Sequence, residues 1–208
     1  THTHAHTYAT MVQTPMIFHI EYLLPILTFW HTISTEISKY KSEALTNNIV
    51  SFIHCVTYIC HYNYEYNMEY MVHMSIGYFT YDLCKMLYYY YYYYAMKTFV
   101  KTNANANANV EFKQSSVYII HHIVTIYLFI VFFTELSYPP VLYSVYILES
   151  SNIMLYISYY IHKEYKHRPV MIAISEGIQL VSNCYYRVFL LSDFIYEHRD
   201  YLIYKMYR

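Results

Sequence analysis

Long apolar runs alternate with short polar connections along most of the chain. Each run approaches the roughly 20 residues that an α-helix needs to cross a hydrocarbon core. The pattern therefore predicts an all-α membrane bundle around a central polar cavity. We expect six transmembrane helices, or seven crossings if the long last run is bent or broken in two. The predicted spans are residues 14–34, 46–62, 70–94, 115–134, 140–161 and 169–196.

Prolines support these boundaries. Pro139-Pro140 and Pro169 lie at the start of the fifth and sixth spans, where a helix accepts proline. Pro25 falls inside the first span and predicts a kink there. We expect residues 14–196 to form a single domain. It would follow a solvated, disordered His/Thr-rich tail (1–13) and precede a short basic tail (197–208). The chain starts at Thr1 without a cleavable signal pattern, so we expect a fragment or a processed product.

Basic residues are distributed unevenly among the connections. Segments 35–45, 95–114 and 162–168 contain Lys or Arg, whereas 63–69 and 135–139 contain neither. By the positive-inside rule, the basic connections face the cytosol and the N-terminus lies on the opposite side. The side of the C-terminal tail depends on whether there are six or seven crossings, and both remain open.

Composition agrees with a helical membrane protein. Charged residues make up 13% of the 208 residues, about half the usual share, and hydrophobic residues make up 57%. Mean hydropathy is only +0.15, but the 32 tyrosines are scored as polar although their amphipathic rings suit membrane interfaces. A net charge of −1 gives no support to nucleic-acid binding, which requires a strongly basic face. The four cysteines lie in apolar segments without a CxxC pair and are expected to be reduced and buried.

Polar residues inside the spans recur at helical spacing, so each span has one polar face. An ionisable side chain at the middle of a bilayer costs about 2.5–3.5 kcal/mol, and grouping such side chains around one hydrated cavity removes most of that cost. We expect Arg187 to pair with Asp82 or Glu149. A purely structural polar core is the alternative for the Ser, Thr and Tyr positions. The polar faces contain Ser51, His54, Tyr58 and His61; Ser75, Tyr78, Asp82 and Lys85; Tyr118, His121, His122 and Thr125; Glu149, Asn152, Tyr156 and Tyr159; and Glu176, Gln179, Asn183 and Arg187.

His121 and His122 are adjacent inside an apolar span. Successive residues of an α-helix point about 100° apart. The two imidazoles are therefore expected to differ in role, and the sequence leaves open which is which.

Five fragments occur in the order "NNIVSFIHCVTY" (47–58), "SIGYFTYDL" (75–83), "YIIHHIVTIY" (118–127), "LESSNIMLY" (148–156) and "NCYYRVFLL" (183–191). Together they resemble the TLC-domain family of membrane proteins, which includes ceramide synthases, translocating-chain-associated proteins and smaller lipid-homeostasis proteins. The resemblance covers about residues 40–195. It implies that His121 and His122 correspond to a catalytic histidine pair and Asp82 to the aspartate of a Tyr-Asp motif. His54, Glu149, Asn152 and Arg187 match further family positions and, with Tyr78, are expected to bind substrate.

The segment "VYILESSNI" replaces the second acidic motif of ceramide synthases, so the chain resembles the branch outside them. The resemblance implies an endoplasmic reticulum protein of lipid metabolism, possessing an acyltransferase activity toward a lipid amine or hydroxyl. Membrane lipid is the expected partner, acyl-CoA a candidate co-substrate, and a homodimer a candidate assembly; no tightly bound cofactor is expected. A non-catalytic lipid-binding, sensing or trafficking protein is the alternative. A di-iron oxidase would need HxxxH and HxxHH boxes that the sequence lacks, so no metal site is predicted.

Overall fold

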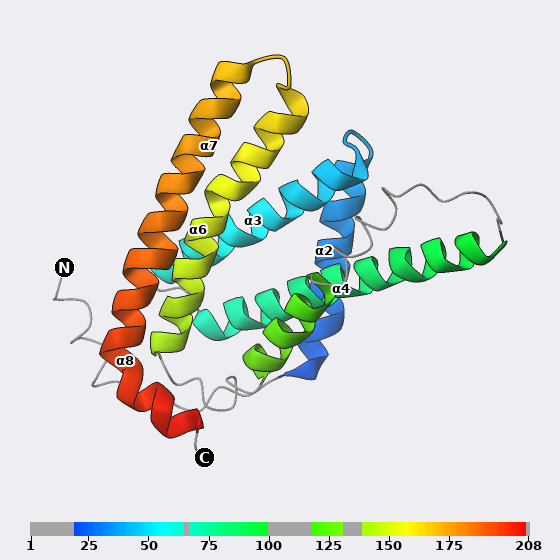
Figure 1. The fold of residues 1–208 in the computed structure, drawn as a ribbon. Helices are drawn as coiled ribbons and strands as arrows, with labels where there is room; N and C mark the ends of the chain where they lie inside the picture. Colours follow the sequence, from blue (N-terminus) through cyan, green and yellow to red (C-terminus); the bar gives the residue numbers. More distant parts are fainter. Residues whose placement is uncertain (1–18, 65–66, 100–117, 131–138, 207–208) are drawn as a thin grey trace. The chain divides into compact units, whose positions relative to one another are not determined.

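The structure, a computed structural model, describes residues 19–64, 67–99, 118–130 and 139–206, and all of its regular elements there are helical (Figure 1). The all-α prediction is confirmed. The helices follow the apolar runs of the sequence closely, because each run supplies the apolar face that a helix buries. The elements are η2 (Ile20–Tyr22), α2 (Leu23–Ser38), α3 (Glu43–Asn63), α4 (Met68–Phe99), a helical segment over 118–130, α6 (Pro139–Glu164), α7 (Pro169–Asn183), η3 (Cys184–Leu190) and α8 (Leu191–Met206).

Two predictions about helix interruptions have different outcomes. Pro25 is the third residue of α2, so it lies in the first turn, where its missing N–H breaks no helical hydrogen bond. The predicted interior kink at Pro25 is therefore wrong. The last apolar run, in contrast, does change its geometry. It continues from α7 into α8 through η3, a seven-residue π-helical segment.

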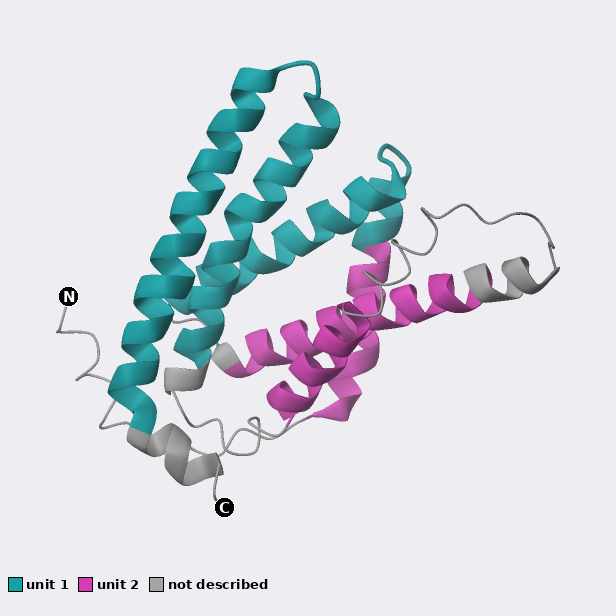
Figure 2. Cartoon of the chain, in the orientation of Figure 1, with its two compact units in different colours: residues 1–13, 33–68, 138–208 teal, residues 14–32, 69–137 magenta. Residues whose placement is uncertain are grey.

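The chain divides into two compact units (Figure 2). Unit 1 contains residues 1–13, 33–68 and 138–208, and unit 2 contains residues 14–32 and 69–137. Helix α2 is shared, because its first ten residues belong to unit 2 and the rest to unit 1. Each unit is described separately below.

Unit 1 is built on α6, which packs against both α3 and α7. Two hydrogen bonds join α3 to α6: Asn48 Nδ2 donates to the Tyr156 carbonyl at 2.9 Å, and Tyr58 Oη donates to the Leu142 carbonyl at 3.1 Å. Tyr58 is completely buried, so this bond satisfies a hydroxyl that would otherwise be costly to bury. The α3–α6 pair is therefore held by specific polar contacts as well as by apolar packing.

The connection before α3 contacts the end of α6. Lys41 Nζ lies 3.2 Å from Glu164 Oε1, which raises the pKa of the Lys41 amine. Lys41 Nζ also lies over the Tyr160 ring, 5.7 Å from its centroid. The two connections that the charge pattern assigned to the same side, 35–45 and 162–168, are thus neighbours in unit 1.

Unit 2 packs the first part of α4 against α2. Residues 71–79 of α4 are all buried. Trp30 of α2, completely buried, donates its indole N–H to the Met74 carbonyl at 3.2 Å. Gly77 lies directly against the Ile26 side chain, because a Cβ at this position would be only 3.1 Å from Ile26 Cβ and closer still to Ile26 Cγ2. This glycine allows the two helices to approach closely.

Among the described helices, none has both the length and the mean hydropathy that crossing a membrane requires.

Candidate functional site

Asp82 and His122 meet inside unit 2. Asp82 lies on α4 and His122 on the helical segment 118–130. Asp82 Oδ2 is 2.9 Å from His122 Nε2, and the exposed fractions of the two side chains are 21% and 8%. The contact is not a well-directed hydrogen bond, and within the described part of the chain the buried Nε2 has no hydrogen-bond partner.

The second nitrogen of His122 determines where protons lie. His122 Nδ1 is 2.8 Å from the Tyr118 carbonyl oxygen, which can only accept, so Nδ1 bears a proton. His122 Nε2 lies beside the Asp82 carboxyl group, and the two side chains form an ion pair when both ring nitrogens are protonated. Both ring nitrogens of His122 therefore face groups of the protein.

His121 has a different environment from its neighbour. It is exposed, whereas His122 is buried. The two ring centroids are 5.5 Å apart with an interplanar angle of 86°, as expected for successive helical positions. The other face of His122 meets the Phe79 ring edge to face, with centroids 5.4 Å apart. Of the two imidazoles, His121 is the one that a ligand can reach.

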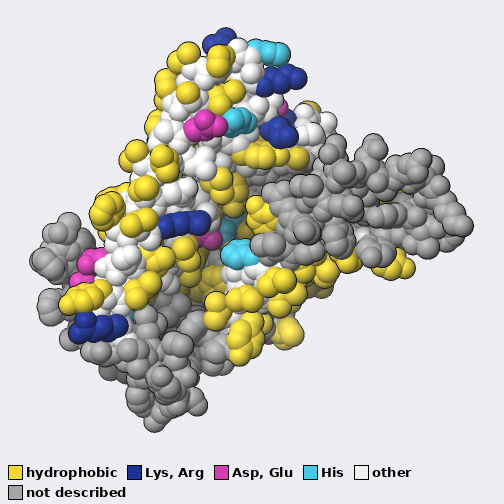
Figure 3. Space-filling view, in the orientation of Figure 1, with side chains coloured by type: hydrophobic (Ala, Val, Ile, Leu, Met, Phe, Trp, Pro, Cys, Tyr) yellow, Lys and Arg dark blue, Asp and Glu magenta, His cyan; other side chains and the backbone are white. Residues whose placement is uncertain are grey.

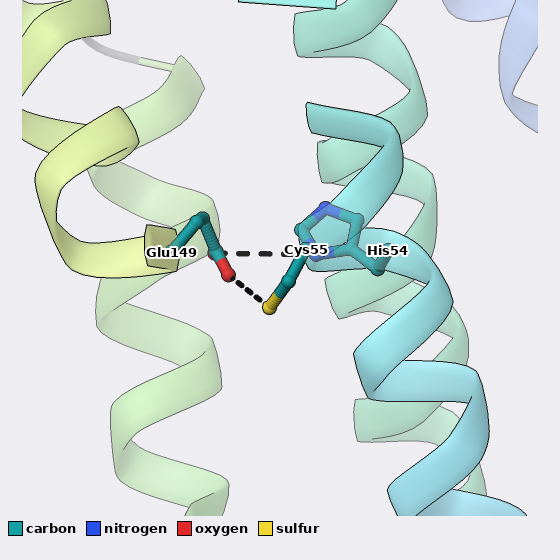
Figure 4. Close-up of side chains that lie close together, drawn as sticks. All are labelled: His54, Cys55 and Glu149. Atoms are coloured by element: carbon teal, nitrogen blue, oxygen red, sulfur yellow. Dashed lines mark hydrogen bonds and ion pairs between the residues drawn. The ribbon is translucent and has the colours of Figure 1, made fainter. Parts of the chain in front are cut away.

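A second polar cluster lies in unit 1, between α3 and α6 (Figure 4). The Cys55 thiol donates to Glu149 Oε2 at 2.6 Å, and His54 Nδ1 lies 3.9 Å from Glu149 Oε1. His54 and Cys55 are each 1% exposed and Glu149 is 7% exposed. One donor atom from each residue lies within 4.8 Å of the other two. These three residues could hold a metal ion.

Arg187 supports this cluster from η3. Its Nε donates to Ser151 Oγ at 2.8 Å and its Nη2 donates to Asn152 Oδ1 at 2.7 Å. Asn152 also hydrogen-bonds the Glu149 carboxylate, and the charge of Arg187 acts on that carboxylate. π-Helical insertions are frequent at functional sites, and here the insertion contains the arginine. Among the described residues, Arg187 does not form the expected direct ion pair with Glu149 and instead donates to Asn152.

Tyr78 has a structural setting. It is 5% exposed and packs edge to face against Trp30, with ring centroids 5.3 Å apart. Tyr78 thus belongs to the core of unit 2, and its expected role in substrate binding stays a prediction.

The predicted site residues are divided between the units. Asp82, His121, His122 and Tyr78 belong to unit 2, whereas His54, Glu149, Asn152 and Arg187 belong to unit 1. The common cavity that would join them stays a prediction.

The expectation that all four cysteines are buried is wrong, because Cys60, Cys84 and Cys184 are exposed. Cys55 is buried as expected, but its contact with Glu149 was missed. Two features of the sequence could have indicated this contact: His54 is adjacent to Cys55, and polar residues recur at helical spacing in the predicted span 140–161.

Models of known protein families do not match this chain, and curated proteins and solved structures gave no significant match. The similarity to TLC-domain proteins stays a prediction that depends on the five sequence fragments.

Proposed function

We propose that this chain is a multi-pass membrane protein of lipid metabolism, of the TLC type, that transfers a fatty acyl group to a lipid amine or hydroxyl. One observation supports the catalytic part above all: the half-buried Asp82 lies 2.9 Å from the buried His122, which is adjacent to the exposed His121. An acid–base site needs an accessible imidazole in a fixed position, and this arrangement supplies one.

The surface of both units supports a lipid environment. Soluble monomers rarely expose large contiguous apolar patches. Here hydrophobic side chains cover much of the described surface on the face shown in Figure 3. Tyrosine contributes to this surface although hydropathy scales count it as polar, and the chain has 32 tyrosines. Exposed aliphatic and Phe side chains include Leu24, Phe29, Ile120, Ile123, Val124 and Leu128 in unit 2, and Ile174, Ile178, Leu180, Val181, Val188 and Phe189 in unit 1.

The basic connections support the proposed orientation and co-substrate. Residues 35–45 and 162–168 are neighbours in unit 1, and Lys and Arg side chains gather over the α6–α7 connection in Figure 3. A shared basic side is what the positive-inside rule requires of cytosolic connections. The same charges would attract the phosphates of acyl-CoA. We therefore propose acyl-CoA as the donor and the endoplasmic reticulum membrane as the location.

In the proposed reaction, His121 acts on the acceptor. An unprotonated His121 nitrogen takes the proton of the acceptor hydroxyl or amine, whose oxygen or nitrogen attacks the thioester carbonyl. The C–S bond breaks, and the CoA sulfur leaves with the proton that His121 had taken. Asp82 and His122 touch neither reactant in this scheme. They fix the helical segment that positions His121, so they are positioning residues.

A non-catalytic lipid-binding or sensing protein is the second candidate. The engagement of both His122 nitrogens within the protein favours it, because such a pair also suits a purely structural polar contact. In that case the exposed apolar surface and the buried polar groups would bind a lipid without turnover.

Comparative lipidomics separates the two candidates. Cells expressing the wild-type chain are compared with cells expressing His121→Ala, at equal protein amounts in membranes. His31→Ala is the matched control, because His31 is an exposed histidine of α2, in the same unit as His121 and outside the basic connections. We expect an acylated lipid to accumulate with the wild type and the control but not with His121→Ala. If the wild type and His121→Ala give identical lipid profiles and the same lipid co-purifies with both, the transferase hypothesis is rejected in favour of the lipid-binding hypothesis.

A further inference from the structure

We infer that His54, Cys55 and Glu149 form a zinc site that joins α3 to α6. The three donor types (imidazole, thiolate and carboxylate) are those that zinc binds in proteins. They come from two helices that already pack together, so the site needs no rearrangement of the backbone of unit 1. This inference is independent of the proposed acyl transfer, which depends on residues of unit 2.

The distances are close to those of a tetrahedral site. Zinc bonds of about 2.0–2.3 Å place neighbouring ligand atoms roughly 3.5 Å apart in a tetrahedron. Here Cys55 Sγ and Glu149 Oε2 are 2.6 Å apart, His54 Nδ1 and Glu149 Oε1 are 3.9 Å apart, and all three donor atoms lie within 4.8 Å of one another. Side-chain rotations alone can move these atoms by the ångström that separates them from zinc geometry. A water molecule would complete the fourth position.

Charge balance favours zinc in this buried place. Burying a carboxylate is expensive unless a positive charge balances it, and each of the three residues is at most 7% exposed. The groups that hydrogen-bond Glu149 here, Cys55 and Asn152, are both neutral. A zinc ion with charge +2 bound by one thiolate and one carboxylate forms a site without net charge. Binding breaks the S–H bond of Cys55, and that proton leaves to solvent as the Zn–S bond forms. The soft sulfur donor disfavours magnesium and calcium, which prefer oxygen ligands.

The surroundings hold the carboxylate in place. Asn152 hydrogen-bonds Glu149, and Arg187 in turn donates to Asn152. Groups behind a metal ligand orient it, and their loss typically lowers metal affinity about 10–100-fold. The inference changes the expected role of two residues, because His54 and Glu149 would bind the ion instead of substrate.

Cobalt substitution of the purified full chain, without an affinity tag of histidines, tests the site. Tetrahedral Co²⁺ bound to a cysteine gives an intense thiolate-to-cobalt charge-transfer band. The band is selective, because the histidines of the N-terminal "THTHAH" segment contain no sulfur. We expect wild-type protein to show the band, to lose it when one equivalent of zinc is added, and to retain one zinc per chain after dialysis.

Two cysteine variants identify the ligand. Cys55→Ser is expected to abolish the band and to weaken zinc binding by about 100-fold or more. Cys60→Ser is the matched control, because Cys60 lies on the same helix but is exposed, and it should bind like the wild type. Absence of the thiolate band in folded wild-type protein would overturn the site even if Cys55→Ser failed to fold. A band that survives Cys55→Ser, or that is lost in Cys60→Ser, would also overturn it.

Discussion

The close approach of α2 and α4 at Gly77 leads to a prediction with a built-in control. A Cβ at Gly77 would overlap Ile26 Cγ2 and lie 3.1 Å from Ile26 Cβ, whereas a Cβ at Gly177 would have no atom within 4 Å. The chain has only these two glycines, and both lie in helices. The same substitution by alanine should therefore have opposite effects at the two positions.

The magnitudes follow from two opposing terms. Gly→Ala inside a helix stabilises by about 1 kcal/mol through backbone entropy and propensity. Overpacking a well-packed core costs about 1–3 kcal/mol. The upper end applies at Gly77, because the opposing atoms belong to Ile26, which is branched next to its backbone and only 5% exposed. We expect Gly77→Ala to lower the free energy of unfolding by about 2 kcal/mol and Gly177→Ala to raise it by up to about 1 kcal/mol.

Thermal unfolding of the purified full chain, followed by far-ultraviolet circular dichroism, measures both changes. For a chain of this length, about 2–4 °C of Tm corresponds to each kcal/mol. Gly77→Ala should therefore lower Tm by about 4–8 °C, and Gly177→Ala should raise it by about 2–4 °C. In the Ile26→Ala background, Gly77→Ala should cost much less, because the overlapping methyl group is gone. A rise in Tm for Gly77→Ala like that of Gly177→Ala would refute the packing of α4 on α2.

Three further predictions concern the polar contacts. Asp82→Asn should lower the rate of acyl transfer by about 10²-fold without changing the helical circular dichroism spectrum, because it removes the charge that helps to hold His122 and so misplaces His121. An unchanged rate would remove Asp82 from the site. Arg187→Lys should lower the free energy of unfolding by about 1–2 kcal/mol, because lysine cannot reproduce the two hydrogen bonds that Arg187 donates to α6. Chemical denaturation measures this change. The same denaturation midpoint for both proteins would argue against these hydrogen bonds. Glu164 raises the pKa of Lys41 in the folded protein. Any stability that the wild type has over Lys41→Gln should therefore be fully present below the unfolded-state pKa of lysine and disappear as pH rises through the folded-state pKa. A Tm difference between the two proteins that grows in alkali would contradict the ion pair.

The positions of the helices could be predicted from the sequence, because apolar runs and prolines mark them directly. The span 46–62 became α3, Glu43–Asn63, and the span 140–161 became α6, which begins at Pro139. The kink at Pro25 was wrong because the start of α2 depends on the preceding η2 turn, for which the apolar run contains no signal. The π-helical geometry at Cys184–Leu190 was also not predictable in detail, since an extra residue in a helical turn leaves no distinct pattern.

The candidate site was predictable only in part. Helical spacing indicated that His121 and His122 would differ, but Asp82 and Tyr118 decide which imidazole is buried. The Cys55–Glu149 contact joins residues 94 positions apart and requires that α3 and α6 pack together. A sequence pattern within one helix cannot show which helix faces it, so Cys55 could be predicted only as buried.

Turnover by purified protein tests the central claim most directly. The full chain is reconstituted in phosphatidylcholine vesicles with a long-chain acyl-CoA and, in separate reactions, a sphingoid base or a lysophospholipid. Release of CoA thiol and formation of the acylated lipid are measured together. With wild type and with His31→Ala, the account predicts equal amounts of CoA and acylated lipid. With His121→Ala it predicts neither product above background. Acylation at the wild-type rate by correctly folded His121→Ala would contradict it.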